Sequence, residues 1–350
     1  MTLILFVDMD SFYASCELLR HPELQKKAFI VGTGDVANKH KGVVEAANYL
    51  AKKFGIRSAM PTSTAMKIKP DISYVPADHE YYEQMSKKVM DTIASHGKRM
   101  EAMSVDEAAV DLDDMGYEGA EKFATELKKD INTKLGLPCT VGVTVGKVLA
   151  KMVCDSAKPD GLKVIREEKL RDFLKGKPVI SIPGIGPKTE KRLEEFNIRT
   201  IDDLAKSTPQ FLADKIGSFG PELYHIANGK DESGVVSEWK IQSISRERTL
   251  DTKTSDLRDV NKMLDMLAEE VISDVRTRGL SFKNISVKAK YDDFTDKLKG
   301  RSLNNYTDSL DVLKETARTL MKELASEKKF RKVGVRVASF TEGKGQKKLF

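Results

Sequence analysis

The chain has 350 residues, of which 40% are hydrophobic and 32% charged, with a formal net charge of +6, and this length predicts roughly two to four domains. Its three cysteines, Cys16, Cys139 and Cys154, lie far apart, which argues against disulfides and structural zinc and favours the reducing cytoplasm. The apolar run of residues 3–9 is too short for a signal peptide or a membrane span, so we expect a cytoplasmic protein without a membrane partner.

Charge is unevenly distributed along the chain. Residues 240–350 hold 25 Lys and Arg against 17 Asp and Glu, whereas residues 1–239 hold 34 against 36. A basic part joined to a near-neutral part predicts that a polyanion is bound mainly from one side. Ordinary solvated surface charge is the alternative explanation.

The first predicted strand ends in acids. Residues 3–9 are Leu-Ile-Leu-Phe-Val-Asp-Met, and Asp10 follows them. An apolar run that ends in acids is typical of a central strand that delivers a carboxylate, here Asp8, to the rim of a sheet. The sequence next predicts a helix over residues 12–19 and a strand over residues 29–32.

The region from about residue 21 to 77 is small and poor in large apolar residues. Residues 34–42 predict a polar, basic loop, and residues 46–54 predict a helix that Gly55 closes. Prolines then separate short elements up to a long helix predicted over residues 80–93.

The functional interpretation depends on residues 103–112, where two adjacent acids, Asp106 and Glu107, interrupt a small apolar run. The pattern predicts a buried strand, in which the two side chains point to opposite faces. Burying an unpaired carboxylate is costly, so a cation is expected, and a divalent metal would supply it. The alternative is a turn between two short strands, with both acids solvated.

Asp8 and the Asp106–Glu107 pair are expected to converge from neighbouring strands. Three carboxylates around two Mg²⁺ ions make a phosphoryl- or nucleotidyl-transfer site. One ion lowers the pKa of an attacking hydroxyl, and the other holds a triphosphate and stabilises its leaving group. The following pattern predicts a helix over 120–135, a strand over 139–145 and a helix over 147–157, which fits an α+β antiparallel sheet with helices on one face.

Residues 181–187, followed by a helix to Phe196, are typical of a helix-hairpin-helix motif. Gly184 and Gly186 let the backbone approach DNA phosphates, and the start of the helix, with Lys188, binds the anion. Such contacts are independent of base sequence. A plain turn between helices is the alternative, and residues 216–220 are either a second, weaker copy or such a turn.

The C-terminal part predicts a β-α-β-β-α-β module after a polar linker within residues 228–240. Strands are expected at 243–249, 284–291, 297–305 and 332–339, and helices at 257–278 and 310–326. Val333, Val335 and Val337 are expected to face the helices. The outward face is predicted to be basic and to lie against a duplex backbone through Lys288, Lys290, Lys299, Arg301, Lys332 and Arg336.

The chain ends in a glycine- and lysine-rich tail that is expected to be flexible. Gln346, Leu349 and Phe350 resemble the start of a peptide that docks on a sliding clamp, although the second aromatic residue of such peptides is missing. The alternative is a disordered basic end.

Four strings in this order, LFVDMDSFYASCE, NYLAKKFGIRSAMP, SVDEAAVD and AKPDG, resemble the Y-family DNA polymerases of the DinB branch. They lie within residues 4–161, and the downstream pattern extends the resemblance over nearly the whole chain. The resemblance implies an α+β, multi-domain right-hand polymerase. Its parts would be a palm (1–20 and 78–166), fingers (21–77), a helix-hairpin-helix thumb (167–232), a linker (233–242), a little finger (243–341) and a flexible tail (342–350).

The resemblance also implies an activity, which is low-fidelity, template-directed translesion DNA synthesis. The enzyme would transfer dNMP from dNTP to a primer 3′-OH and release pyrophosphate, without a proofreading exonuclease. The implied cofactor is two Mg²⁺ ions, for which Mn²⁺ can substitute. The implied partners are primer-template DNA and dNTP, with a sliding clamp through the tail, and the chain is expected to be a monomer.

Residue roles follow from the matched motifs. Asp8, Asp106 and Glu107 match the catalytic metal ligands, and the Met9 carbonyl matches the backbone ligand. The implied nucleotide contacts are Tyr49, Lys52 and Lys158 at the triphosphate and Tyr13, next to Phe12, under the sugar.

The chain departs from the family pattern at two places. Glu45-Ala46 stands where a small residue and then Thr or Ser are usual, and Lys52 stands where Arg is usual. The lost hydroxyl and guanidinium are expected to weaken the grip on the triphosphate, and Glu45 is expected to crowd or repel near the nascent base pair.

Three other functions compete with a polymerase. A non-catalytic DNA-binding or scaffold protein would need only the hairpin and the basic module, and a nucleotidyl cyclase would need no thumb. A metal nuclease would also use acids. The sequence shows no second cluster of acids that would indicate a separate exonuclease site. The three acids, together with about 180 further residues, favour the polymerase.

Overall fold

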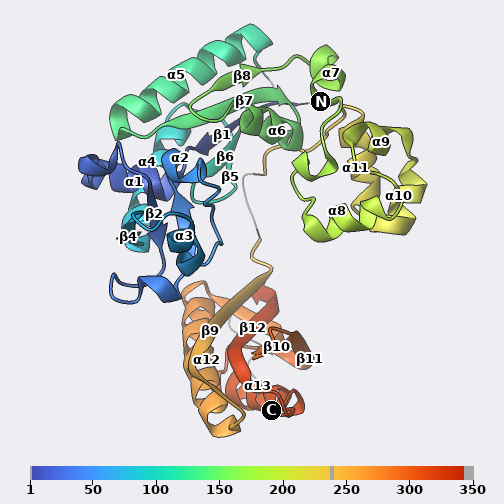
Figure 1. Ribbon diagram of the computed structural model, residues 1–350. Helices are drawn as coiled ribbons and strands as arrows, with labels where there is room; N and C mark the ends of the chain where they lie inside the picture. Colours follow the sequence, from blue (N-terminus) through green and yellow to red (C-terminus); the bar gives the residue numbers. More distant parts are fainter. Residues whose placement is uncertain (1, 113, 237–239, 343–350) are drawn as a thin grey trace. The chain divides into compact units, whose positions relative to one another are not determined.

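The computed structural model describes residues 2–112, 114–236 and 240–342, and it divides into two compact units, Met1–Glu238 and Trp239–Phe350 (Figure 1). Gln346, Leu349 and Phe350, the residues of the predicted clamp peptide, lie outside the described residues. Among those described, no helix combines the length and the apolar character that crossing a membrane requires.

The first unit is built on a five-stranded sheet. Its strands, in spatial order, are β5 (Met100–Ala102), β6 (Glu107–Asp111), β1 (Leu3–Met9), β7 (Cys139–Val145) and β8 (Leu162–Val164). The first four are antiparallel, and β8 runs parallel to β7. The predicted strands over residues 3–9 and 139–145 are confirmed, while β8 has no counterpart in the sequence-based prediction.

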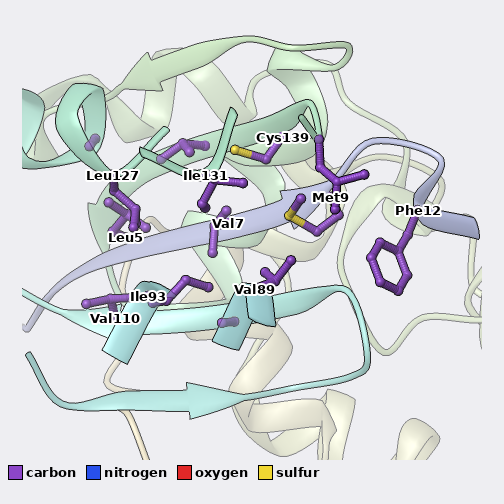
Figure 2. Packing of buried hydrophobic residues seen from close by; sticks show 14 of the residues in the cluster. Leu5, Val7, Met9, Phe12, Val89, Ile93, Val110, Leu127, Ile131 and Cys139 are labelled. Carbon is purple, nitrogen blue, oxygen red and sulfur yellow. The ribbon is translucent and has the colours of Figure 1, made fainter. Parts of the chain in front are cut away.

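Helices cover both faces of this sheet (Figure 1). The four helices around it are α1 (Phe12–Arg20), α4 (His79–Ala94), α5 (Tyr117–Leu135) and α6 (Lys147–Ala157). On one face, Leu5 and Val7 pack with Val89 of α4 and with Leu127 of α5 (Figure 2). On the other face, α6 covers β1.

The prediction of helices on one face only is therefore wrong. Ile4 and Phe6 of β1 point away from Leu5 and pack against Ala150 and Cys154 of α6. Because β1 is apolar at every position from residue 3 to 7, each face of it must be covered. Asp8 continues the face of Ile4 and Phe6, so the carboxylate lies on the α6 side.

The segment between α1 and α4 forms a small module around a three-stranded sheet. Its strands lie in the order β3 (Val44–Ala47), β2 (Phe29–Gly32) and β4 (Ser73–Pro76), with the short helices α2 (Tyr49–Lys52) and α3 (Thr62–Ile68). The helix predicted over residues 46–54 is wrong. Ala46 and Ala47 pair with β2, and the Asn48 side chain accepts a hydrogen bond from Ala51 N at 2.9 Å, so the helix begins only after Asn48.

Five short helices form the last part of the first unit. They are α7 (Leu170–Leu174), α8 (Pro187–Glu194), α9 (Ile201–Lys206), α10 (Pro209–Ile216) and α11 (Gly220–Ala227). Their apolar core is continuous with Leu149 and Val153 on α6, so α6 lies between the sheet and these helices.

Two glycine turns lie side by side in these helices. Gly184 precedes α8 with φ +95°, and Gly217 joins α10 to α11 with φ +90°. A Cβ on Gly184 would come 3.1 Å from the Phe219 ring, so the turns are in contact. Residues 216–220 thus form a second helix–turn–helix.

The start of the predicted linker is bound to the sheet domain. The Asp231 carboxylate accepts hydrogen bonds from Val148 N and Leu149 N, at 2.7 and 3.1 Å, and so caps α6. Further along, Val236 N donates to Glu101 Oε2 at 2.8 Å. Residues 231–236 are therefore fixed chain, which the polar composition did not reveal.

The second unit has the predicted β-α-β-β-α-β order. Its elements are β9 (Ser243–Thr254), α12 (Leu257–Thr277), β10 (Leu280–Tyr291), β11 (Asp296–Thr307), α13 (Leu310–Glu323) and β12 (Phe330–Glu342). The antiparallel sheet has the order β11-β10-β12-β9. As predicted, Val333, Val335 and Val337 are buried against the helices.

Candidate active site and nucleic-acid interface

Two of the three predicted acids are paired neighbours on adjacent strands of the sheet. Asp8 of β1 pairs in register with Glu107 of β6, on the face that α6 covers. Burial, and next the neighbouring Glu107, raise the pKa of Asp8 to about 7, although Lys158 opposes the shift. Two carboxylates that lie beside each other repel unless they share a proton or a cation lies next to them. The pairing of Asp8 with Glu107 therefore favours the binding of a cation at this position.

Three lysines on or just after α6 approach three acids on three strands. Lys158 Nζ lies 2.5 Å from Asp8 Oδ2, and Lys151 forms an ion pair with Glu107. Lys147 Nζ lies 2.7 Å from the buried Glu101. The helix thus supplies positive charge along the edge of the acidic site.

Asp106 lies in the loop between β5 and β6, so the expectation of one strand over residues 103–112 is wrong. The loop is tied to β1, since Met9 N donates to Asp106 O at 2.9 Å. Its carboxylate accepts a hydrogen bond from Ser104 Oγ at 2.6 Å. The alternative prediction, a turn between two short strands, is therefore correct for the backbone. The two acids are not fully solvated, because Asp106 and Glu107 are both half-buried.

Asp10 is the central residue that the sequence-based site missed. It is 1% exposed and accepts hydrogen bonds from Tyr49 Oη at 2.7 Å, Thr140 Oγ1 at 3.1 Å and Asp160 N at 2.8 Å. It therefore joins the turn after Lys158 to the small module that carries Tyr49. The available signal was a second acid two residues after Asp8, at the end of the same strand.

The predicted triphosphate contacts come together beside these acids. Tyr49 reaches Asp10, Lys158 reaches Asp8, and Lys52 Nζ lies 2.7 Å from Ser11 Oγ and 4.4 Å from the centre of the Tyr49 ring. The two lysines at one edge of the carboxylates are donors suited to phosphate oxygens, whereas the single O–H of Tyr49 is donated to Asp10.

Tyr13 and Phe12 occupy different environments. The Tyr13 ring stacks on Tyr82, with ring centres 4.2 Å apart and planes at 15°, and meets the edge of His79 at 6.2 Å. Phe12 is 3% exposed in the hydrophobic core (Figure 2). Of the two rings, only Tyr13 is therefore partly exposed.

Glu45, the unusual acid of the small module, faces His79. Its Oε2 lies 2.7 Å from His79 Nε2, and the Glu45 side chain is 14% exposed. Ala46 is buried and pairs with Val31. The Glu45–His79 contact ties β3 to the start of α4, beside Tyr13.

The predicted hairpin residues lie at the start of α8. Gly186 is the N-terminal flanking residue of the helix, Pro187 begins it, and Lys188 is exposed in its first turn. The Gly184 φ of +95° is a conformation that favours glycine. The first backbone N–H groups of α8 therefore adjoin the exposed Lys188.

The second unit has an open, basic sheet face, but two predicted residues are not on it. Lys288, Lys290, Lys332 and Arg336 share the open face, with Glu247 among them. The predicted outward position of Lys299 and Arg301 is wrong.

The register of β11 on β10 determines which face Lys299 and Arg301 occupy. Lys299 pairs with the buried Val287, and Arg301 pairs with the buried Ile285, so both point to the helix side. There they form ion pairs with Glu323 of α13. Because the side-chain period of a strand is two, a shift of one position exchanges the faces.

Three family models match the chain. The "impB/mucB/samB family" matches residues 7–155, its C-terminal domain matches residues 241–349, and "DNA polymerase-iota, thumb domain" matches residues 180–231.

Curated relatives and solved structures agree with these models. "DNA polymerase IV 2" of Methanosarcina mazei is 36% identical over 97% of this chain and 93% of its own, and "DNA polymerase IV" of Methanoculleus marisnigri is 34% identical over 97% and 95%. The structure titled "Y-family DNA polymerase chimera Dbh-Dpo4(243-245)-Dbh" matches with a TM-score of 0.88 and 30% identity, over 97% of this chain and 100% of that one. The "Insertion ternary complex of Dbh DNA polymerase" matches with a TM-score of 0.68, 30% identity and the same coverage. The chain therefore belongs to the DinB branch of the Y-family DNA polymerases.

Proposed function

We propose that this DNA-directed DNA polymerase transfers dNMP from dNTP to a primer 3′-OH at Asp8, Asp106 and Glu107, and releases pyrophosphate. The observation that carries the proposal is the opposition of Asp8 and Glu107, with Lys158 on Asp8. A solved relative is titled an insertion ternary complex, which supports the binding of DNA and dNTP by this chain.

The donor set fits divalent ions. Asp8, Asp106, Glu107 and the Met9 carbonyl offer only oxygen, which Mg²⁺ and Mn²⁺ prefer. Within the described ranges, no three acidic, His or Cys side chains are already placed around one point. Asp106 must therefore turn from Ser104 to join the other two. Two bound ions would activate the primer hydroxyl and stabilise the charge of the leaving pyrophosphate.

The residues beside the acids bind and orient the triphosphate. Lys158 and Lys52 supply positive charge, and the Tyr49 hydroxyl, which donates to Asp10, must turn its O–H away from that carboxylate to donate to a phosphate oxygen. Phosphoryl-type transfer depends mainly on positioning of the reactants and on stabilisation of charge. Lys158, Lys52 and Tyr49 would therefore supply much of the catalytic contribution of the protein.

The small size of the module over residues 21–77 supports low-fidelity translesion synthesis. The module has only short helices and a small core, so it checks the geometry of the nascent pair weakly.

A primer extension assay on a defined template tests the proposal. With Mg²⁺ and all four dNTPs, the chain is expected to lengthen a labelled primer and to insert a nucleotide opposite an abasic site. A scaffold protein would bind the primer-template and leave the primer length unchanged, and that result would contradict the proposal.

Tyr13 is proposed to exclude ribonucleotides. Its ring is held by Tyr82 at the start of the helix that follows Asp8. A ring fixed there leaves room for a 2′-hydrogen but not for a 2′-hydroxyl. Tyr13→Ala is therefore expected to raise ribonucleotide incorporation relative to dNTP by at least about tenfold, about 1.4 kcal/mol of lost discrimination. Single-nucleotide incorporation rates measure this ratio.

Phe12→Ala is the matched control for this prediction. Because Phe12 is buried in the core, its loss is expected to lower the free energy of unfolding by about 3–5 kcal/mol, without a selective gain of ribonucleotides. If Tyr13→Ala rejects ribonucleotides as strongly as the parent does, the residue that excludes them lies elsewhere.

The open face of the second unit and the hairpin at Gly184 are proposed to hold the duplex through its phosphates. Glu247 opposes this binding. It accepts hydrogen bonds from Lys288 at 3.1 Å, and its other oxygen lies 2.6 Å from Lys332 Nζ. Phosphates must therefore compete with Glu247 for these two lysines.

Glu247→Gln is expected to tighten primer-template binding about three- to tenfold near 0.1 M salt and to steepen the salt dependence by about one unit of log–log slope. The control is Glu323→Gln, which releases Lys299 and Arg301 on the other side of the sheet. Fluorescence anisotropy titrations at several salt concentrations measure both effects. Equal effects of the two variants would show that the open face is not the DNA surface.

A further inference from the structure

The small module over residues 21–77 is basic. It holds nine Lys and Arg against four Asp and Glu, although residues 1–239 as a whole hold more acids than bases. The triphosphate contact Lys52 accounts for only one of the nine. The remaining positive charge favours another contact between this module and a polyanion, in addition to the triphosphate contact.

A hollow of about 640 Å³ gathers part of this charge. Its lining includes Lys26, Lys27, Lys53 and Lys69 against one acid, Asp71. Lys69 pairs with Asp71 at 2.8 Å. The other three lysines are exposed, and no ion pair involves them within the residues described.

An exposed aromatic ring lies in the same hollow. Phe54 is 51% exposed, and Lys69 Nζ stands 4.9 Å from the centre of its ring. The lysine lies over one face of the ring, while half of the side chain remains open. Leu50 and Ala28 add an apolar floor. Lysines around an open aromatic ring are the combination that binds unpaired nucleic acid, with bases stacked and phosphates paired.

The hollow adjoins the active site through a single turn of helix. Tyr49 and Lys52 of α2 point to Asp10 and Ser11, while Leu50 and the following Lys53 and Phe54 line the hollow. A strand bound there would lie one helical turn from the triphosphate contacts.

We propose that this hollow binds an unpaired DNA strand, with a base stacked on Phe54 and phosphates on Lys26, Lys27 and Lys53. The identification of this strand as the unpaired template rests on the proposed function. The binding itself does not, because it can be measured without primer extension.

Affinity for a primer-template with a six-nucleotide 5′ template overhang, compared with the blunt duplex, tests the proposal. The overhang is expected to tighten binding by the full chain, and Phe54→Ala is expected to remove at least about fivefold of that gain. Phe54→Trp should retain the gain. Phe294→Ala, which removes a ring that is 61% exposed in the other unit, is the matched control. An overhang gain that is equal in the parent and in Phe54→Ala would overturn the proposal.

Photo-crosslinking locates the contact. 5-Iodouracil in the overhang is expected to attach to the tryptic peptide of residues 54–57, since trypsin cleaves after Lys53 and Arg57. Attachment only to other peptides would overturn the proposal. Binding of free dTTP that Phe54→Ala abolishes, without an overhang effect, would assign the hollow to free nucleotides and also overturn it. Loss of primer extension with retained crosslinking would instead contradict the proposed function alone.

Discussion

Asp106→Ala is expected to reduce primer extension by at least about a thousandfold, about 4 kcal/mol of transition-state stabilisation. Asp106 is half-buried in the β5–β6 loop, and its carboxylate contacts Ser104. The fold therefore tolerates its loss, whereas the proposed ion site loses one of three carboxylates. Single-turnover extension with saturating primer-template measures the effect.

Binding and stability controls separate this loss from damage to the fold. Asp106→Ala should bind primer-template within a few fold of the parent, because the proposed phosphate contacts lie on other residues. Asp91→Ala, which removes an exposed acid on α4, should extend primers normally. Substantial residual extension by Asp106→Ala would contradict the assignment of this residue to the ion site.

Removing the second unit is expected to weaken primer-template binding by at least about a hundredfold near 0.1 M salt. A fragment of residues 1–236 retains both large cores of the first unit. It keeps the acids and the triphosphate contacts, so slow extension should persist. It loses the open basic face and, with it, most of the proposed duplex contacts.

The salt dependence identifies the missing contacts. Without Lys288, Lys290, Lys332 and Arg336, the log–log slope of affinity against salt should become shallower by about three. Anisotropy titrations from low to moderate salt provide this slope. An unchanged slope in the fragment would show that the first unit makes the phosphate contacts.

The sequence predicted those elements whose pattern has a single explanation. The strand over residues 3–9 and the helix over 147–157 have their predicted bounds, because apolar runs and helical spacing mark them clearly. The helix over 46–54 failed because Ala46 and Ala47 suit a helix by propensity, yet pair with β2 in a buried sheet. Tertiary pairing there prevailed over local preference.

The faces of elements were less predictable than the elements themselves. Lys299 and Arg301 alternate correctly, but only the pairing of β11 with β10 decides which set faces the helices. At an edge strand a lysine tolerates either side, since its end reaches solvent or an acid such as Glu323. The amino-acid composition of β11 therefore does not indicate which of its two faces packs against the helices.

The supporting residues of the site could not be inferred from motifs alone. Asp10 contacts Tyr49, Thr140 and Asp160, which lie between 39 and 150 positions away along the chain. Lys151 reaches Glu107 only because α6 packs on the same sheet face. Such contacts arise from the topology, which brings distant segments to one edge of β1.

Counting bound Mn²⁺ by electron paramagnetic resonance most directly tests the claim that Asp8, Asp106 and Glu107 form the ion site. The measurement uses the full chain with dNTP and a primer-template whose primer lacks a 3′-OH. Two ions per chain are expected in the parent, and fewer than two in Asp106→Ala under the same conditions. The same number of ions in both proteins, or none in the parent, would contradict the account.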